Sequence, residues 1–319
     1  MQTGHVIGLD LGCCMLYGAL HSNSTLFSLH HLQKLDLSRN DFNRSVISSS
    51  FGQFLHLTHL NLYSSNFAGQ VPPEISHLSR LLRELYLGGV NMSLVVPSSL
   101  MNLSSSLSSL QLWRCGLKGE LPELDSTSYL KSVKKMYLNG CNFVGSNLDL
   151  LGNLTQLTAL LLSNNQLIGR IPSQISRLSG LIILDISHNL LSGTIPSSLF
   201  SMPSLHFLLL NNNLLYGQIS PFLCNSLQYI NLSFNKLYGQ IPPSVFKLEH
   251  LRLLRLSSND KLTGNISSVI CELKFLEILD LSNNGFSGFI PQCLGNFSGG
   301  LLVLHLGGNN LHGNIPSIY

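Results

Sequence analysis

The 319-residue sequence predicts an α/β repeat solenoid, in which short parallel strands alternate with helical return segments along the whole chain. Two observations lead to this fold class. A pattern of leucines followed by Asn, Gly and Ile-Pro recurs every 22 to 26 residues. Within each copy, apolar and polar residues alternate over an L-x-L segment, as in a strand with one buried face. A period of this length indicates an array of repeats.

The repeat follows the consensus L-x-x-L-x-L-x-x-N-x-L-x-G-x-I-P, and its cleanest copy is Leu181–Pro196. The asparagine position recurs thirteen times, so residues 1–319 are predicted to form one leucine-rich-repeat array of about thirteen repeats. The residues at this position are Cys14, Asn40, Ser65, Val90, Cys115, Cys141, Asn165, Asn189, Asn213, Asn235, Asn259, Asn284 and Asn309.

Each consensus residue has a physical role in this prediction. The leucines of L-x-L point inward, and the Asn side chain is expected to be buried where it bonds backbone groups of its own and the adjacent repeat. Cys14, Cys115 and Cys141 would occupy that buried position as small apolar side chains with free thiols. Ser65 and Val90 are each followed by an asparagine, which leaves open a shift of one residue. Gly permits a positive φ, and Pro ends the strand that precedes it.

The composition excludes several classes of protein. Hydrophobic residues make up 44% and charged residues 10% of the chain, which is too apolar for a disordered protein. The net charge of +3 is spread over scattered basic residues, so no nucleic-acid partner is expected. No apolar run reaches the length of a transmembrane helix, and residues 1–5 lack the pattern of a signal peptide.

No motif for catalysis, a cofactor or a metal appears in the sequence. Kinase, serine-hydrolase and zinc-hydrolase signatures are absent. His56 and His59 would not share a face on a strand and turn, so we expect no metal site there. Aspartates that recur at one outward position of different repeats are interpreted as solvated consensus residues. The chain is therefore predicted not to be an enzyme.

Outward positions of the predicted strands offer a different kind of site. Tyr63, Tyr86, Trp113 and Tyr137 fall on neighbouring strands of one exposed sheet, and Trp113 is the only tryptophan. Aromatic and arginine side chains on a rigid face are typical of binding hot spots. The alternative is that these aromatic rings merely cover the sheet. The predicted ligand-binding residues are His59, Tyr63, Glu84, Tyr86, Trp113, Arg114, Lys135 and Tyr137.

The Gly-x-Ile-Pro insert resembles the plant-specific class of leucine-rich repeats. The segments Thr3–Leu11, His21–Leu29, Phe67–Pro72 and Ile290–Ser298 are similar to plant receptor-like proteins of the disease-resistance type. The resemblance implies a horseshoe with a parallel concave β-sheet, which senses a peptide or protein ligand on the extracellular face of the plasma membrane. It also implies that the full-length protein works with a co-receptor kinase. The chain starts inside the first repeat and stops within the last, without terminal caps, so we interpret it as an ectodomain fragment.

Sequons and cysteines bear on the cellular compartment. The N-x-S/T sequons are Asn23, Asn43, Asn91, Asn102, Asn153, Asn231, Asn265 and Asn296, and they predict glycosylation in a secreted form. Cys271 and Cys293 lie one repeat apart at similar positions, so a disulfide between them is one outcome and two free thiols the other. Cys13 and Cys224 have no evident partner.

Three functional hypotheses remain from the sequence. The first is the ligand-recognition region of a plant receptor-like protein in defence or peptide sensing. The second is a secreted inhibitor similar to plant polygalacturonase-inhibiting proteins, which would need both terminal caps with their cysteine pairs. The third is a truncated product without independent function, because solenoids need polar capping repeats at their ends.

Overall fold

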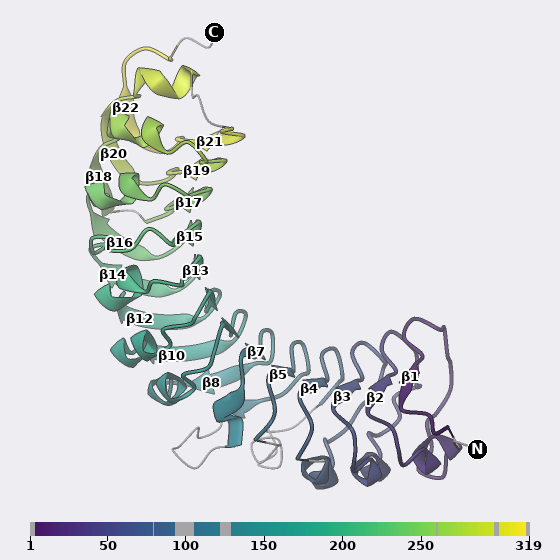
Figure 1. Cartoon of the computed structure of the whole chain (residues 1–319). Helices are drawn as coiled ribbons and strands as arrows, with labels where there is room; N and C mark the ends of the chain where they lie inside the picture. The colour runs from purple at the N-terminus through teal and green to yellow at the C-terminus, as the bar shows by residue number, and fades with distance from the viewer. Residues whose placement is uncertain are drawn as a thin grey trace. The chain divides into compact units, whose positions relative to one another are not determined.

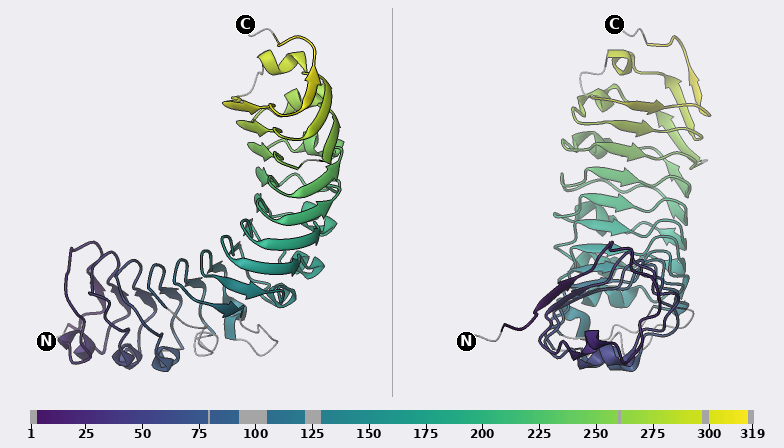
Figure 2. Two further views of the ribbon diagram at one scale, coloured as in Figure 1. Left: turned by 180° about the vertical axis from the view of Figure 1, so that it is seen from behind. Right: turned by 90° about the vertical axis from the view of Figure 1, so that its right-hand side faces the viewer.

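The computed structural model describes residues 4–78, 80–92, 105–121, 129–259, 261–296 and 300–316. The chain divides into two compact units, Met1–Gln166 and Leu167–Tyr319. Both units are leucine-rich-repeat solenoids in which each coil contributes a short strand to one parallel sheet (Figure 1). We call this sheet the front sheet of its unit, and the second sheet formed on the opposite side of the coils its back sheet (Figure 2).

In the first unit, the front sheet holds seven parallel strands in chain order. They are β1 (Gly8–Asp10), β2 (Lys34–Asp36), β3 (His59–Asn61), β4 (Glu84–Tyr86), β5 (Ser109–Gln111), β7 (Lys135–Tyr137) and β9 (Ala159–Leu161). Its back sheet contains β6 (Gly119–Glu120) and β8 (Phe143–Gly145), and earlier coils are joined there by isolated bridges such as Val46 to Ala68. The return segments are the 3-10 helices η1 (Thr25–Ser28), η2 (Ser49–Gln53), η3 (Pro73–His77), η4 (Tyr129–Ser132) and η5 (Asp149–Asn153).

In the second unit, both sheets are regular. The front strands are β11 (Ile183–Asp185), β13 (Phe207–Leu209), β15 (Tyr229–Asn231), β17 (Leu253–Arg255), β19 (Ile278–Asp280) and β21 (Val303–His305). The back strands are β10 (Gln166–Arg170), β12 (Leu190–Thr194), β14 (Leu214–Gly217), β16 (Lys236–Gly239), β18 (Lys261–Asn265), β20 (Gly285–Phe289) and β22 (Asn310–His312). The 3-10 helices are η6 (Ser173–Arg177), η7 (Ser197–Ser201), η8 (Pro243–Lys247), η9 (Ser268–Glu272) and η10 (Gln292–Asn296). The helical part of the predicted α/β repeat is thus a single 3-10 turn in the described coils.

Alternation of apolar and polar residues explains the front strands. The middle residue of β3 to β5 points inward and is fully buried, as Leu60, Leu85 and Leu110 show, while the flanking residues are half-buried except for Ser109, which is buried. Parallel pairing keeps these leucines in register, with Leu60 opposite Leu85 and Leu85 opposite Leu110. Each buried leucine contributes roughly 1.5–3 kcal/mol of transfer free energy before conformational entropy is subtracted. The core is therefore continuous from coil to coil within each unit.

The consensus asparagine bonds the backbone of two coils at once. Asn259 is fully buried, and its Nδ2 donates to the carbonyl of Leu256 at 2.9 Å and to that of Leu232 in the preceding coil at 3.0 Å. Its Oδ1 accepts from the amide of Leu237 at 3.0 Å. The same pattern of Nδ2 bonds recurs at Asn40, Asn165, Asn213, Asn235, Asn284 and Asn309. These side chains pair backbone groups that burial would otherwise leave unsatisfied.

The irregular consensus positions keep the same register. Ser65 is fully buried and its hydroxyl donates to the carbonyl of Leu37 at 2.8 Å, so no shift of one residue occurs there. Val90 is also fully buried. Cys115 and Cys141 take the predicted buried place, and their thiols face carbonyls of the preceding coil. Cys14 is a free thiol as predicted, but its predicted burial is wrong, because no described coil packs on the outer side of the first repeat.

Candidate functional site

Two aromatic rings meet on the front sheet of the first unit. Tyr63 follows β3 and Trp113 follows β5 at the equivalent position, and their ring centroids lie 4.9 Å apart at an interplanar angle of 32°. The residue at the same position of the coil between them is Gly88, which follows β4 and is buried. A Cβ at Gly88 would lie 2.8 Å from Nε1 of Trp113. The glycine therefore leaves the space through which the indole reaches Tyr63.

A guanidinium group lies near each ring of this pair. The Cζ of Arg39 is 5.9 Å from the centroid of Tyr63, and the Cζ of Arg114 is 5.9 Å from the centroid of Trp113. These distances are within the range of cation–π attraction. Both arginines are exposed and adopt a left-handed backbone, with φ of 53°. We call Arg39, Tyr63, Trp113 and Arg114 the arginine–aromatic row.

A second group, polar and acidic, lies on the same strands. His59 of β3 pairs in register with Glu84 of β4, and its Nε2 is 3.6 Å from Oε1 of Glu84. The hydroxyl of Tyr86 donates to the other carboxylate oxygen of Glu84 at 2.5 Å. Burial of the phenol, followed by this hydrogen bond, raises the pKa of Tyr86 to about 12. Tyr86 is therefore held as a neutral donor against Glu84.

A depression of about 350 Å³ opens beside these residues over β1 to β4. Its wall includes three carboxylates, those of Asp10, Asp36 and Glu84, and one lysine, Lys34. Asp36 also accepts from the amide of Asn61 at 2.8 Å and from the backbone amide of Ser38 at 2.8 Å. The predicted residues His59, Glu84 and Tyr86 thus line a concave, acidic surface next to the arginine–aromatic row.

The remaining predicted residues lie at the far edge of this surface. Lys135 is exposed at the start of β7, where it pairs with Ser109, and Tyr137 pairs with Gln111. In the described part of the chain, Tyr86 and Tyr137 make no ring contact with Tyr63 or Trp113. All eight predicted residues therefore share one sheet face, but only two of the four aromatic rings touch.

Sequence reasoning missed two members of the site. Arg39 and Gly88 were not singled out, although the sequence contained a signal for each. Arg39 immediately precedes the consensus asparagine, as Arg114 precedes Cys115. Gly88 occupies the same column as Tyr63 and Trp113 on the intervening strand. Comparing the residues at this position in successive coils would have identified Gly88 as the small residue between two large rings.

The front sheet of the second unit has a different surface. Phe207 of β13 and Tyr229 of β15 stack with centroids 4.5 Å apart. Arg252 is already paired with Glu277, with Nη1 at 2.6 Å from Oε1. Asn231 of β15 uses its Oδ1 to accept from the amide and the hydroxyl of Ser233. The aspartates at the equivalent position, Asp36, Asp185 and Asp280, accept the backbone amide of the serine two residues later. These carboxylates therefore stabilise the turn after the strand and are not merely solvated.

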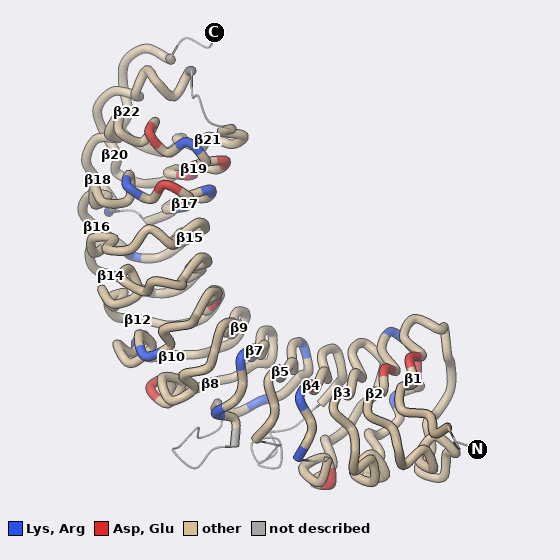
Figure 3. Tube along the Cα trace, in the orientation of Figure 1, with Lys and Arg blue, Asp and Glu red and all other residues tan. Residues whose placement is uncertain are grey.

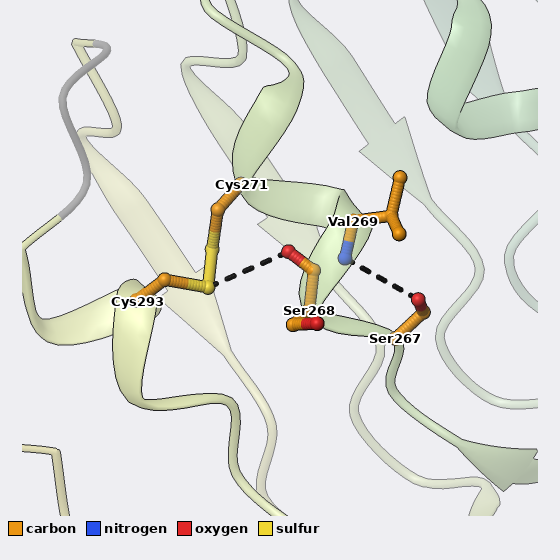
Figure 4. The surroundings of a disulfide bond; sticks show 5 residues. All are labelled: Ser267, Ser268, Val269, Cys271 and Cys293. Atoms are coloured by element: carbon orange, nitrogen blue, oxygen red, sulfur yellow. Dashed lines mark hydrogen bonds between the residues drawn. A yellow bond between two sulfur atoms is a disulfide. The ribbon is translucent and has the colours of Figure 1, made fainter.

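Cysteines and sequons occupy other parts of the coils. Cys271 of η9 and Cys293 of η10 form a disulfide, and the sulfur of Cys293 also lies 3.5 Å from the carbonyl of Ser268 (Figure 4). Cys13, Cys14, Cys115, Cys141 and Cys224 are free. The sequon residues Asn23, Asn43, Asn91 and Asn265 are exposed, and Asn153 and Asn231 are half-buried. Asn102 lies outside the described residues, as does the side chain of Asn296.

The described residues contain neither a metal-binding cluster nor a membrane-spanning helix. No group of three or more His, Cys, Asp or Glu side chains has an arrangement suited to a metal ion. None of the described helices has the length and apolarity that crossing a membrane requires. Charged side chains are sparse along both units (Figure 3).

Comparison with known families supports the repeat assignment. The Leucine Rich Repeat family model matches residues 31–54, 56–78, 156–178, 180–202, 226–248 and 275–297. Among curated sequences, the chain is 43% identical over 148 residues to Receptor-like protein 9DC1 of Solanum pimpinellifolium, covering 38% of the chain and 17% of the relative. It is 37% identical over 164 residues to Receptor-like protein Cf-9 of the same species, covering 43% and 18%. It is 33% identical over 189 residues to Receptor-like protein 6 of Arabidopsis thaliana, covering 54% and 18%.

Solved structures give the same picture. The ectodomain of the Arabidopsis receptor kinase HAESA, in complex with the peptide hormone IDA and the co-receptor SERK1, matches with a TM-score of 0.90 and 31% identity over 99% of this chain and 52% of that one. The PEPR1–AtPEP1 structure matches with a TM-score of 0.84 and 32% identity, covering 97% and 46%. The chain spans less than a fifth of the curated relatives and about half of these structures. The chain therefore has the leucine-rich-repeat fold and is similar, over part of its length, to plant receptor-like proteins.

Proposed function

We propose that the front sheet of the first unit is the ligand-recognition surface of an extracellular receptor region, and that its ligand is a peptide or a protein. The single observation that carries this proposal is the contact of Tyr63 and Trp113 on a rigid sheet, with exposed arginines at both ends. Tryptophan, tyrosine and arginine are the residues most enriched in binding hot spots. Recognition fits this arrangement, because the row itself consists of aromatic rings and guanidinium groups rather than of an acid and a base.

Relatives support the class of ligand and partner. HAESA is described in complex with a peptide hormone and the co-receptor SERK1, and PEPR1 in complex with AtPEP1. By analogy, we propose that the full-length protein binds its ligand together with a co-receptor kinase, in defence or peptide sensing. The residues proposed to contact the ligand are His59, Tyr63, Glu84, Tyr86, Trp113, Arg114, Lys135 and Tyr137.

An extracellular location at the plasma membrane belongs to the same proposal. The Cys271–Cys293 disulfide supports it, because disulfides persist mainly in oxidising compartments. The exposed sequons Asn23, Asn43, Asn91 and Asn265 provide surface positions for N-linked glycans. We propose that Asn102, Asn153, Asn231 and Asn296 are also modified. Removing N-linked glycans from the secreted chain, followed by peptide mass mapping, tests each sequon separately.

Selection from a random-peptide display library tests the recognition surface. The whole chain is the bait, and the affinity of each selected peptide is then measured by calorimetry on the wild type and on Trp113→Ala. We expect Trp113→Ala to weaken binding by roughly tenfold or more, as loss of a hot-spot residue does. The matched control is Phe207→Ala, which removes an aromatic ring from the front sheet of the second unit. Equal loss in both variants, or in neither, would contradict the proposal.

A further inference from the structure

We propose that the arginine–aromatic row selects an acidic peptide segment, in which an aromatic side chain lies between two carboxylates. This inference rests on the proposed function and specifies the chemistry of the ligand. The row combines two exposed cations at its ends with two aromatic rings at its centre. A ligand that satisfies all four groups carries negative charge at two separated points and a ring between them.

The guanidinium groups of Arg39 and Arg114 are available to pair with a ligand carboxylate. In the described part of the chain, the ion pairs involve His59 with Glu84 and Arg252 with Glu277, and neither Arg39 nor Arg114 takes part in one. Each is exposed, and each guanidinium lies 5.9 Å from the centroid of one of the two rings. A carboxylate that reaches such a guanidinium forms charge-assisted hydrogen bonds, frequently two in parallel. The ends of the row are therefore complementary to acidic side chains.

The centre of the row favours an aromatic partner. Tyr63 and Trp113 are half-buried, so part of each ring is exposed for a ligand. A third ring that packs on such a pair gains from burial and from ring–ring geometry. Gly88 keeps the pair in contact, because a larger residue there would collide with the indole. This part of the site is preformed, which reduces the ordering cost of binding.

Strand spacing sets the distance between the backbones of the two arginines. Arg39 follows β2 and Arg114 follows β5, which are three strands apart in the front sheet. At about 4.8 Å per strand, the two arginine backbones are separated by roughly 14 Å. An extended peptide advances about 3.3 Å per residue, so side chains four positions apart span nearly the same distance. The expected segment thus has acidic residues four positions apart and an aromatic residue midway.

A peptide fits better than other anions. A nucleic acid would need a longer basic surface, whereas the net charge of the chain is only +3 and its basic residues are scattered. An acidic oligosaccharide would offer carboxylates and a ring face, but its closely repeated charges do not match two arginines whose backbones lie about 14 Å apart. Trigalacturonic acid is therefore included in the test as a competing ligand.

Trp113 provides a direct optical signal for the test, because it is the only tryptophan in the chain. The probe is the blocked peptide GSEGFGEGS, which contains no tryptophan and has its two glutamates four positions apart. Matched probes replace both glutamates with lysine (GSKGFGKGS) or the phenylalanine with alanine (GSEGAGEGS). Each is titrated into the whole 319-residue chain while the emission of Trp113 is recorded.

The expected result is a saturable change with GSEGFGEGS, a weaker one with the alanine probe and none with the lysine probe. Arg39→Gln and Arg114→Gln should each lower the affinity roughly threefold to fivefold, as expected for an exposed ion pair. Arg44→Gln is the matched control, since Arg44 is also an exposed arginine with a left-handed backbone. It should leave the affinity unchanged, and circular dichroism should show all variants folded.

Two outcomes would overturn the inference. One is equal or tighter binding of the lysine probe or of trigalacturonic acid. The other is binding of GSEGFGEGS that is insensitive to Arg39→Gln and Arg114→Gln. If library-selected peptides still lose affinity on Trp113→Ala in either case, the recognition surface stands and only the proposed ligand chemistry fails. If no selected peptide depends on Trp113, the proposed function itself fails.

Discussion

Replacing Asn259 with alanine should destabilise the second unit more than any exposed substitution. Three short hydrogen bonds end on this fully buried side chain, two from Nδ2 to carbonyls of Leu232 and Leu256 and one from the amide of Leu237 to Oδ1. Alanine leaves all three backbone groups buried without that partner. Each such loss costs about 1 kcal/mol or more, so the expected decrease in the free energy of unfolding is about 3 kcal/mol.

The assay is urea unfolding followed by far-ultraviolet circular dichroism, with hydrogen exchange as a local readout. Asn225→Ala is the matched control, because Asn225 is an exposed asparagine of the same unit. Asn259→Ser should fall between the two, since Ser65 shows that a hydroxyl at this position retains one of the carbonyl bonds. In the alanine variant, the amide of Leu237 should exchange faster than in the wild type.

The reasoning would be refuted if Asn259→Ala and Asn225→Ala had the same midpoint in urea. It would also be refuted if the alanine variant lost stability but the amide of Leu237 kept its protection. The first result would mean that the buried asparagines contribute no net stability. The second would mean that the loss arises elsewhere in the coil.

Three further predictions follow from single contacts. Gly88→Ala should change the fluorescence emission of Trp113 and lower the free energy of unfolding by about 1 kcal/mol or more. Gly307→Ala is the control, because Gly307 takes the equivalent position in its coil and has open space around it, and it should have neither effect. Unchanged emission in Gly88→Ala would contradict the contact between this position and the indole. Tyr86 should ionise near pH 12, so the stability that its neutral phenol adds is present below pH 10 and is lost as the pH rises through 12. The difference in absorbance between the wild type and Tyr86→Phe measures this ionisation, and Glu84→Gln should lower its midpoint pH. A midpoint at pH 10 in the wild type would contradict the raised pKa. Cys293→Ser should lower the thermal unfolding midpoint, because a disulfide that closes a loop of this size stabilises by about 3 kcal/mol. A reducing agent should lower the midpoint of the wild type but not that of the variant. A reductant effect that persists in the variant would indicate a different disulfide.

The repeat was predictable because its physics is local and recurs in every coil. The inward leucines, the buried asparagine and the glycine of positive φ each follow from a residue type at a fixed position, as Leu184, Asn213 and Gly193 show. Burial of Ser65 and Val90 was less certain from sequence, because the following asparagine offered a competing register. The backbone hydrogen bonds between neighbouring coils fix the register at these two positions.

Other features depend on contacts between coils and were not predictable from one repeat. Arg114 and His188 have positive φ although neither is glycine, because their amides bond to carbonyls of the next coil. The sequence placed Tyr63, Tyr86, Trp113 and Tyr137 on one face, but it did not show which of these rings touch. The contact between Tyr63 and Trp113 depends on Gly88, and its only sequence signal is the gap that a glycine leaves between two large residues at the same position of neighbouring coils.

The most direct test of the recognition surface is to map where a selected peptide lies on the chain. A peptide from the display library, carrying a photoreactive group, is cross-linked to the whole chain and the products are located by mass spectrometry. The account predicts cross-links to the segments 59–63, 84–86, 111–114 and 135–137 of the first front sheet. Cross-links confined to the 3-10 helix Pro73–His77 on the return side, or to the front strands of the second unit, would contradict it.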